Sequence, residues 1–149
     1  MIIREFRSED SGELYRMSME SFDEYYQPEV FYSFFIQWPA GQLIACDFMG
    51  KPIGFISTTK LFDGRARILL FAVKPEYRNK GVGYKLLSAF RLKAMMEGIR
   101  SITLEVRPTN EGARHFYKKN GFMETEILPN YYQDGGEGIR MDGPVQLNI

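Results

Sequence analysis

The stretch FAVKPEYRNKGVGYKLL (residues 71–87) decides how this chain folds. An apolar run ends at Val73, a basic turn follows, and Gly81 and Gly83 then open an apolar pattern of helical spacing. Glycine is favoured where the backbone turns sharply or must come close to a ligand. The stretch therefore predicts a strand, a tight loop and a helix, with two residues that allow close backbone approach.

The start of that helix is a predicted anion site. Backbone N–H groups at a helix N-terminus have no intrahelical acceptor and carry partial positive charge. Arg78 and Lys80 add cationic groups beside Gly81 and Gly83, and loops of this kind bind phosphate oxygens. The spacing R-x-x-G-x-G matches neither the dinucleotide fingerprint nor the mononucleotide P-loop. We therefore predict a diphosphate ligand of another class, with a plain strand-to-helix turn as the alternative.

Outward from this stretch, the hydrophobic pattern alternates between strands and helices. Residues 50–52 and 63–64 are hairpin turns, Pro28 begins a helix and Gly98 ends one. The predicted order is β-α-α-β-β-β-α-β-α-β-β. A single parallel crossover inside a mostly antiparallel sheet makes this an α+β layered fold, and the length favours one domain over residues 1–149.

The bulk composition argues against several classes of protein. Lys+Arg and Asp+Glu both number 19, so the formal net charge is zero and we expect no nucleic-acid partner. Cys46, the only cysteine, lies in an apolar run that predicts a buried strand thiol, and His115 is the only histidine, so neither a disulfide nor a zinc site is expected. No apolar run approaches the about 18 residues that span a bilayer, and the charged N-terminus is unlike a signal peptide. We expect a cytoplasmic protein that binds no metal and no membrane.

Two motifs give the chain a family resemblance. Residues 71–87 resemble the acetyl-CoA pyrophosphate loop of the GCN5-related N-acetyltransferase (GNAT) superfamily. Residues 104–122, LEVRPTNEGARHFYKKNGF, resemble the strand and helix that follow it there, with the pattern N-x-x-A-x-x-x-Y-x-x-x-G-F from Asn110 to Phe122. The resemblance implies a mostly antiparallel sheet of roughly six or seven strands flanked by about four helices, and acetyl-CoA as the co-substrate without a metal.

Two further segments narrow the resemblance to one branch. Residues 128–141, LPNYYQDGGEGIRM, and 22–35, FDEYYQPEVFYSFF, are similar to segments of the protein N-terminal acetyltransferases, although GGEGI stands where that branch often has GEDAY. That branch includes the ribosomal-protein alanine acetyltransferases and archaeal N-terminal acetyltransferases. The resemblance implies acetyl transfer from acetyl-CoA to the α-amino group of a protein or peptide N-terminus.

Two other functions are left open. The acceptor is alternatively a small amine, such as a polyamine or an amino acid, or a lysine side chain. The chain is alternatively a non-catalytic coenzyme-binding subunit that regulates a partner. A homodimer is left open as its assembly.

The resemblance also implies which residues bind and activate the coenzyme. Tyr117 is implied as the general acid for the departing thiolate, and a phenol has a reference pKa of about 10. The backbone amide of Val73 is implied as the oxyanion donor, at the end of a strand that splays from its neighbour. Asn110 is implied beside the pantetheine arm and is also a good helix N-cap. The implied coenzyme-binding residues are Phe71, Ala72, Val73, Arg78, Asn79, Lys80, Gly81, Val82, Gly83, Tyr84, Asn110 and Tyr117.

The resemblance also implies residues that act on the acceptor: carboxylates as the general base and tyrosines as the peptide contacts. Glu105 matches the carboxylate that acts as general base, through water, in the ribosomal-protein branch. A carboxylate in an apolar strand needs hydrogen bonds or a cleft, and a solvent-facing strand residue is the alternative. Glu24 is the competing base, because it matches a glutamate beside the peptide in the other branch. The implied peptide contacts are the tyrosines, which combine apolar area with a polar handle: Tyr26, Tyr131 and Tyr132.

Overall fold

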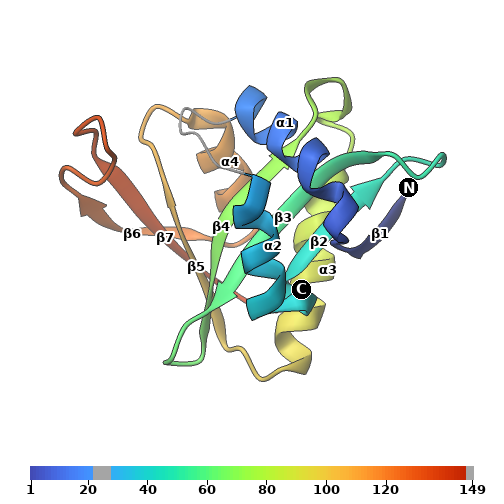
Figure 1. Cartoon of the computed structure of the whole chain (residues 1–149). Coiled ribbons are helices and arrows are strands. Elements are labelled where there is room, and N and C mark those ends of the chain that lie inside the picture. Colours follow the sequence, from blue (N-terminus) through green and yellow to red (C-terminus); the bar gives the residue numbers. More distant parts are fainter. Residues whose placement is uncertain (22–27, 147–149) are drawn as a thin grey trace.

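The computed structural model describes residues 1–21 and 28–146 (Figure 1). The elements in chain order are β1 (Ile2–Glu5), α1 (Ser11–Ser21), α2 (Pro28–Gln37), β2 (Gln42–Cys46), β3 (Pro52–Lys60), β4 (Arg65–Val73), α3 (Val82–Met96), β5 (Ser101–Val106), α4 (Glu111–Lys119), β6 (Met123–Leu128) and β7 (Gly138–Pro144). Short 3-10 turns lie at Ser8–Asp10, Pro39–Gly41 and Pro75–Tyr77. This order is the one predicted from the sequence. None of the helices in the described ranges is long and apolar enough to cross a membrane.

The strands form one seven-stranded sheet in the order β1-β2-β3-β4-β5-β7-β6. Every neighbouring pair is antiparallel except β4 and β5, which are parallel. Parallel neighbours need a crossover connection, and α3 provides it here. The predicted α+β sheet with one parallel crossover is confirmed.

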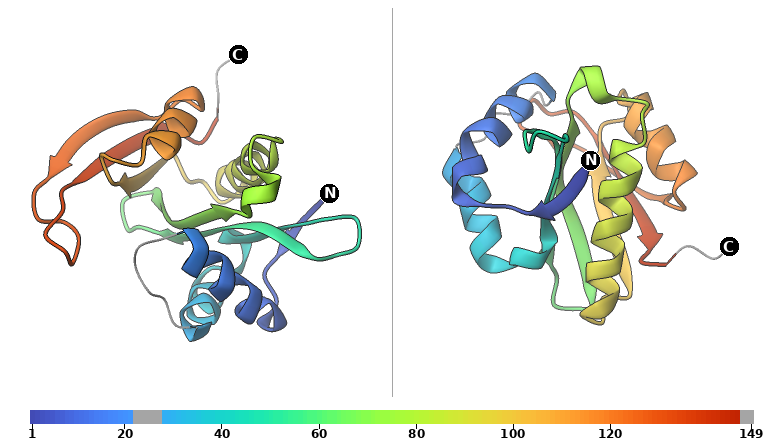
Figure 2. Two further views of the ribbon diagram at one scale, coloured as in Figure 1. Left: turned by 90° about the horizontal axis from the view of Figure 1, so that it is seen from above. Right: turned by 90° about the vertical axis from the view of Figure 1, so that its right-hand side faces the viewer.

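Helices cover both faces of the sheet. Figure 2 shows α1 and α2 on one face and α3 and α4 on the other. Leu14, Met17 and Phe31 bury the first face together with residues of β2 to β4, including Cys46. Leu86 and its neighbours on α3 bury the second face. Cys46 is therefore the buried strand thiol that was predicted, and burial raises its pKa.

A β-bulge in β4 exchanges the faces of that strand. Ile68 and Leu70 pair with successive residues of β3, so Leu69 is an extra residue. Ile68 packs in the α3 cluster, whereas Leu70 packs in the α1 cluster. Beyond the bulge, Phe71 and Val73 therefore face α3 and α4. The bulge thus aims the end of β4 toward the face where the glycine-containing loop lies.

Strands β4 and β5 separate after a short stretch of pairing. The parallel ladder joins only residues 65–67 to residues 101–103. Beyond it the two strands diverge, as Figure 1 shows, and we call this opening the fork. The splay expected at the end of β4 is therefore present, and it leaves backbone groups of two strands without a neighbouring strand.

Candidate active site

A cavity of about 880 Å³ lies on the α3/α4 face beside the fork. Its walls come from the end of β4, the loop after it, the start of α3 and one side of α4. Cavities of this size hold cofactor-sized ligands. Every residue implied as coenzyme-binding lines it except Lys80. We call it the donor cavity.

The loop that enters α3 presents free backbone amides to this cavity. Gly81 is the N-cap of α3 with φ of 84°, a conformation that L side chains rarely adopt, and a Cβ there would meet open space. The first hydrogen bond along the helix runs from the amide of Lys85 to the carbonyl of Gly81, at 3.1 Å. The amides of residues 82–84 therefore lack an intrahelical acceptor. Open space above bare amides at a helix N-terminus fits a diphosphate.

Arg78 and Lys80, the two cations before Gly81, differ in whether they line the donor cavity. Arg78 lines the donor cavity, and its Nε donates to the carbonyl of Val73 at 3.0 Å, which holds the loop against the end of β4. Lys80 is exposed, lies outside the cavity lining, and places its ammonium 5.9 Å from the centre of the Tyr77 ring. Tyr77 itself lines the cavity. A phosphate contact by Lys80 remains a prediction.

The amide of Val73 points into the fork. The amide of Lys74 donates to the carbonyl of Ile53 at 2.9 Å, so that pair is hydrogen-bonded across β3 and β4. Hydrogen-bonded and non-hydrogen-bonded pairs alternate along an antiparallel ladder, so Val73 and its partner Gly54 form a non-hydrogen-bonded pair. The N–H of Val73 then points away from β3, toward the side where β5 has diverged. This geometry suits the oxyanion-donor role implied for Val73.

Tyr117 lines the donor cavity from α4. It is 8% exposed, and its ring packs edge-on against Phe71, Phe116 and Phe122. Burial raises the pKa of its hydroxyl above the ordinary value, so the phenol keeps its proton at neutral pH. The Tyr117 hydroxyl makes no hydrogen bond within the described residues. Every fully buried side-chain oxygen in that part of the chain does have a hydrogen-bond partner, so the Tyr117 hydroxyl is not fully buried and reaches the cavity surface. A protonated group facing the cavity can serve as an acid.

Asn110 caps α4 by accepting from the amide of Ala113 at 3.2 Å, which confirms its N-cap role.

Several residues that line the donor cavity were missed in the sequence. Residues 113, 116, 117 and 120 share one side of α4 and all line the cavity. Their helical spacing was the signal that would have found the additional pair Phe116 and Asn120. Tyr77 and Lys119 also line it without any comparable sequence signal.

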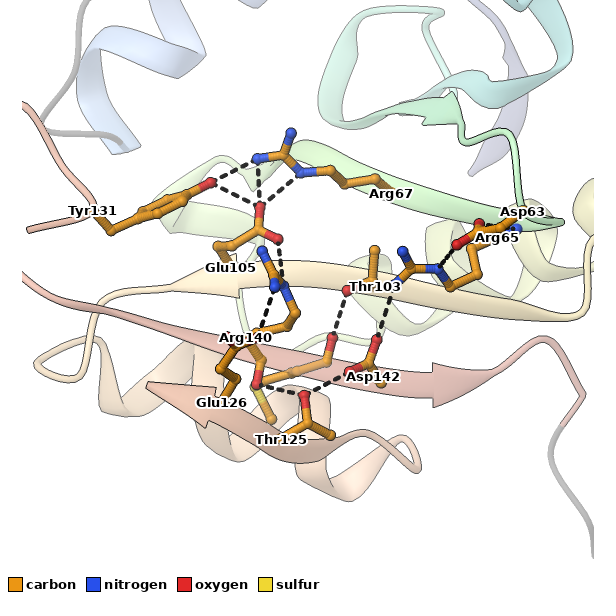
Figure 3. A network of polar contacts seen from close by, with 11 residues as sticks. Asp63, Arg65, Arg67, Thr103, Glu105, Thr125, Glu126, Tyr131, Arg140 and Asp142 are labelled. Carbon is orange, nitrogen blue, oxygen red and sulfur yellow. Dashed lines mark hydrogen bonds and ion pairs between the residues drawn. The ribbon is translucent and has the colours of Figure 1, made fainter. Parts of the chain in front are cut away.

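The opposite face of the sheet carries a polar network at the fork, drawn in Figure 3. Residues of β5 that face α3 alternate with Glu105, whose side chain therefore points to the other face. Arg67 of β4 reaches across the fork and donates from Nε to Oε1 of Glu105 at 2.7 Å. The hydroxyl of Tyr131 donates to the same oxygen at 3.0 Å and accepts from Nη2 of Arg67 at 2.7 Å. We call Arg67, Glu105 and Tyr131 the acceptor network.

The second oxygen of Glu105 faces β7. Arg140, directly opposite Glu105 in the ladder, places Nε 3.4 Å from Oε2 and pairs its Nη1 with Glu126 at 2.8 Å. The side chain of Glu105 is only 6% exposed. The alternative of a solvent-facing strand residue is therefore wrong, and the cost of burial is met by guanidinium partners. Neither Arg67 nor Arg140 was singled out in the sequence, because their proximity depends on the register of three strands.

Arg107, the residue after β5, makes further contacts with the loop between β6 and β7. The guanidinium of Arg107 lies 3.9 Å from the ring centre of Tyr132 and pairs with Asp134 at 3.1 Å. Asp134 also accepts from the amide of Gly136 at 2.9 Å, and this bond and then Arg107 hold the pKa of Asp134 below its usual value. A Cβ on Gly136 would lie 2.9 Å from Arg107. Gly136 thus leaves room for the guanidinium, whereas its neighbour Gly135 has a φ of 84° that favours glycine.

The remaining predictions fall outside these groups. Glu24 and Tyr26 lie outside the described residues. His115 is exposed on α4, in agreement with the prediction of a surface residue, and it does not line the donor cavity. Within the described part of the chain, no group of three His, Cys, Asp or Glu side chains is placed to hold a metal ion.

Comparison with known proteins places these features in a family. The acetyltransferase (GNAT) family model matches residues 12–122. The chain is 30% identical over 128 residues to N-alpha-acetyltransferase 30 of Schizosaccharomyces pombe, with 84% of this chain and 85% of the relative covered. It is similar to the solved structure of Ard1 from Thermoplasma volcanium, with 38% identity, a TM-score of 0.93 and 98% of both chains covered. It also resembles the ribosomal-protein-S18-alanine N-acetyltransferase of Escherichia coli, with 26% identity, a TM-score of 0.83 and coverage of 99% and 96%.

Proposed function

The chain belongs to the acetyltransferase (GNAT) family, and from that membership we propose that it transfers an acetyl group from acetyl-CoA to the α-amino group of a protein or peptide N-terminus. One observation carries the proposal: the donor cavity and the acceptor network lie on opposite faces of the sheet and both border the fork. Two substrates entering from opposite faces can meet there without competing for space. The names of the relatives, which include an N-alpha-acetyltransferase and a ribosomal-protein alanine N-acetyltransferase, support this acceptor.

The chain's own groups have distinct tasks in this transfer. Acetyl-CoA, when bound, supplies the thioester that is attacked. The bare amides at the start of α3 hold its pyrophosphate, with Arg78 as the adjacent cation. The amide of Val73 donates to the carbonyl oxygen as negative charge develops there. Tyr117 holds the proton that the departing thiolate requires.

The acceptor amine needs a group that takes its proton. Only a neutral amine attacks a carbonyl, and an α-amine has a reference pKa of about 7.7–8.0. Glu105 is the carboxylate of the acceptor network and stands beside the fork. We assign the general-base role to Glu105 and the peptide-contact role to the loop that carries Tyr131 and Tyr132. Glu24 stays a competing prediction for the base, and the cytoplasm stays the predicted location.

A transfer assay tests the proposal against the other acceptors. Labelled acetyl-CoA is incubated with short peptides whose α-amine is free, and with the same peptides blocked at the N-terminus but carrying an internal lysine. Spermidine and free lysine serve as small-amine acceptors. We expect label only in peptides with a free α-amine.

The other outcomes each identify a different function. Label in the blocked peptides would assign the chain to lysine side chains, and label in spermidine or lysine would assign it to small amines. Tight coenzyme binding without transfer to any amine would favour the regulatory subunit. Any of these three results overturns the proposed acceptor.

A further inference from the structure

We propose that the hydroxyl of Tyr131, oriented by Arg67, relays the proton of the acceptor ammonium to Glu105. The proposal rests on the proposed function for the identity of the acceptor, and it assigns Tyr131 a catalytic role and Arg67 a positioning role. It replaces the water that the family resemblance places between amine and carboxylate with a side chain of this protein.

The direction of the Tyr131 proton follows from its two partners. A guanidinium group has donors only, so the contact of 2.7 Å between Nη2 of Arg67 and the hydroxyl uses an oxygen lone pair of Tyr131. The hydroxyl hydrogen is then directed to the other neighbour, Oε1 of Glu105 at 3.0 Å. A carboxylate accepts hydrogen bonds and cannot compete as a donor. Arg67 thus fixes one orientation of the phenol out of several.

The burial of these groups favours a relay over direct contact. The side chain of Glu105 is 6% exposed, whereas Tyr131 is 37% exposed. Oε1 already receives hydrogen bonds from Arg67 and Tyr131, and Oε2 faces Arg140 of β7. An amine approaching from solvent on this face therefore meets Tyr131 before the carboxylate. Figure 3 shows the Tyr131 side chain extending from its loop to Glu105 and Arg67.

The chemical step balances without a further reactant. One N–H bond of the ammonium breaks and its proton bonds to the remaining lone pair of the Tyr131 oxygen. At the same time the original O–H bond of Tyr131 breaks and that proton bonds to Oε1 of Glu105. The amine is left neutral with its lone pair free, Tyr131 is unchanged, and the carboxylate becomes a carboxylic acid.

The protonation state of Tyr131 suits this role. Burial and then the charge of Glu105 raise its pKa above the usual value, so the phenol carries a proton to pass on throughout the neutral range. Among the described residues, the charged groups around the pair are Arg67 on β4, Arg140 on β7 with its partner Glu126 on β6, and Arg107 with Asp134 beside the loop.

Kinetics of five variants test the relay, each with acetyl-CoA and the best acceptor peptide. We expect Tyr131→Phe and Glu105→Gln each to lower kcat by about 100-fold, because general base catalysis contributes at least that much. The double variant should be no slower than the slower single variant by more than about 3-fold, since groups acting in series are not additive. Arg67→Met should lower kcat by about 10-fold, and Arg67→Lys should recover part of that loss.

Arg65 supplies the matched control. It lies on the same strand two residues before Arg67 and pairs with Asp63 at 2.8 Å, away from Glu105 (Figure 3). Arg65→Met should leave kcat and both KM values unchanged. Thermal unfolding of every variant shows whether it folds, and if Glu105→Gln does not, Tyr131→Phe and the Arg67 pair carry the test.

Two results with the variants would overturn the relay. A Tyr131→Phe enzyme that keeps its kcat and only raises the peptide KM would make Tyr131 a peptide-binding group. Effects of Tyr131→Phe and Glu105→Gln that multiply in the double variant would show that the two groups act independently. A wild-type enzyme that acetylates spermidine or lysine and no peptide contradicts the proposed function instead, and the same variants then test the relay with that amine. A wild-type protein that acetylates no amine contradicts both.

Discussion

The donor cavity and the acceptor network differ in whether backbone groups or side chains form them. The donor cavity depends on backbone: bare amides at the start of α3, a glycine with φ of 84°, and a strand end whose N–H points into the fork. The acceptor network depends on side chains from β4, β5 and a loop, held by hydrogen bonds of 2.7–3.0 Å. A backbone site fixes one ligand chemistry, whereas a side-chain site can change with few substitutions. This difference predicts that variants separate donor binding from acceptor chemistry.

The largest expected effect is a loss of acetyl-CoA binding in the donor cavity. Gly81→Val places a β-branched residue at φ of 84°, where it is strained, and fills the open space above the helix amides. We expect the Kd for acetyl-CoA, measured by calorimetry, to rise by about 100-fold. Gly98→Val is the matched control, because Gly98 has φ of 79° and open space at the other end of α3. Equal loss of affinity in both variants would show that strain, and not lost phosphate contact, is the cause.

The next effect separates chemistry from binding on the donor side. Tyr117→Phe keeps the packing of a ring that contacts three phenylalanines and removes the hydroxyl that holds the proton. We expect kcat to fall by about 10- to 100-fold while the Kd for acetyl-CoA changes by less than about 2-fold. An unchanged kcat in Tyr117→Phe would remove the acid role from this residue.

A smaller effect is expected on the peptide KM, which reports on the acceptor side. Arg107→Ala removes the cation that lies against the Tyr132 ring and pairs with Asp134, so the loop that carries Tyr131 keeps its hydrogen bond to Glu105 but loses its contacts with Arg107. We expect the peptide KM to rise by about 5- to 10-fold, in line with about 1–2 kcal/mol for a cation–π contact and its ion pair. The KM for acetyl-CoA should not change. If both KM values rise together, the loop is coupled to the donor cavity and the two regions are not separable.

The smallest effect tests an ion pair that joins α1 to the end of β4, outside both regions. Glu13 of α1 pairs with Lys74 at the end of β4 at 2.6 Å, and Lys74 holds the pKa of Glu13 below its usual value. A lowered pKa in the folded state adds stability above the unfolded-state pKa of about 4.3, and that stability is lost as the pH falls through the folded-state value.

Denaturant unfolding measures this contribution. At pH 7 we expect Glu13→Gln to lower the free energy of unfolding by about 1 kcal/mol. The difference between wild type and variant should shrink toward zero as the pH falls below about 4. A difference that persists at low pH would assign the effect to packing and not to the ion pair.

The two regions also differ in how well the sequence predicted them. The order of elements and the donor cavity follow from local signals: glycine at a helix start, asparagine at an N-cap, and apolar residues of regular spacing. Lys80 is the exception in the donor set, because neighbouring residues on a turn point in different directions. Phe116 and Asn120 were missed although α4 places them on the cavity side.

The acceptor network could not be predicted in the same way. Arg67, Glu105 and Arg140 are neighbours only because β5 lies between β4 and β7. In this order β7 separates β5 from β6, although β5 and β6 are consecutive along the chain. The register that sets Arg140 opposite Glu105 joins residues that are 35 positions apart. Sequence resemblance therefore identified Glu105 and Tyr131 individually but not the arginines that hold them together.

The most direct measurement is a crystal structure with a conjugate in which the sulfur of CoA is joined through an acetyl bridge to the α-amine of a peptide. We predict its pyrophosphate on the amides of residues 82–84, its sulfur in the fork between Val73 and Tyr117, and its peptide on the opposite face beside Tyr131. A conjugate with its phosphates elsewhere, or with both halves on the α3/α4 face, would contradict a transfer that takes place through the fork.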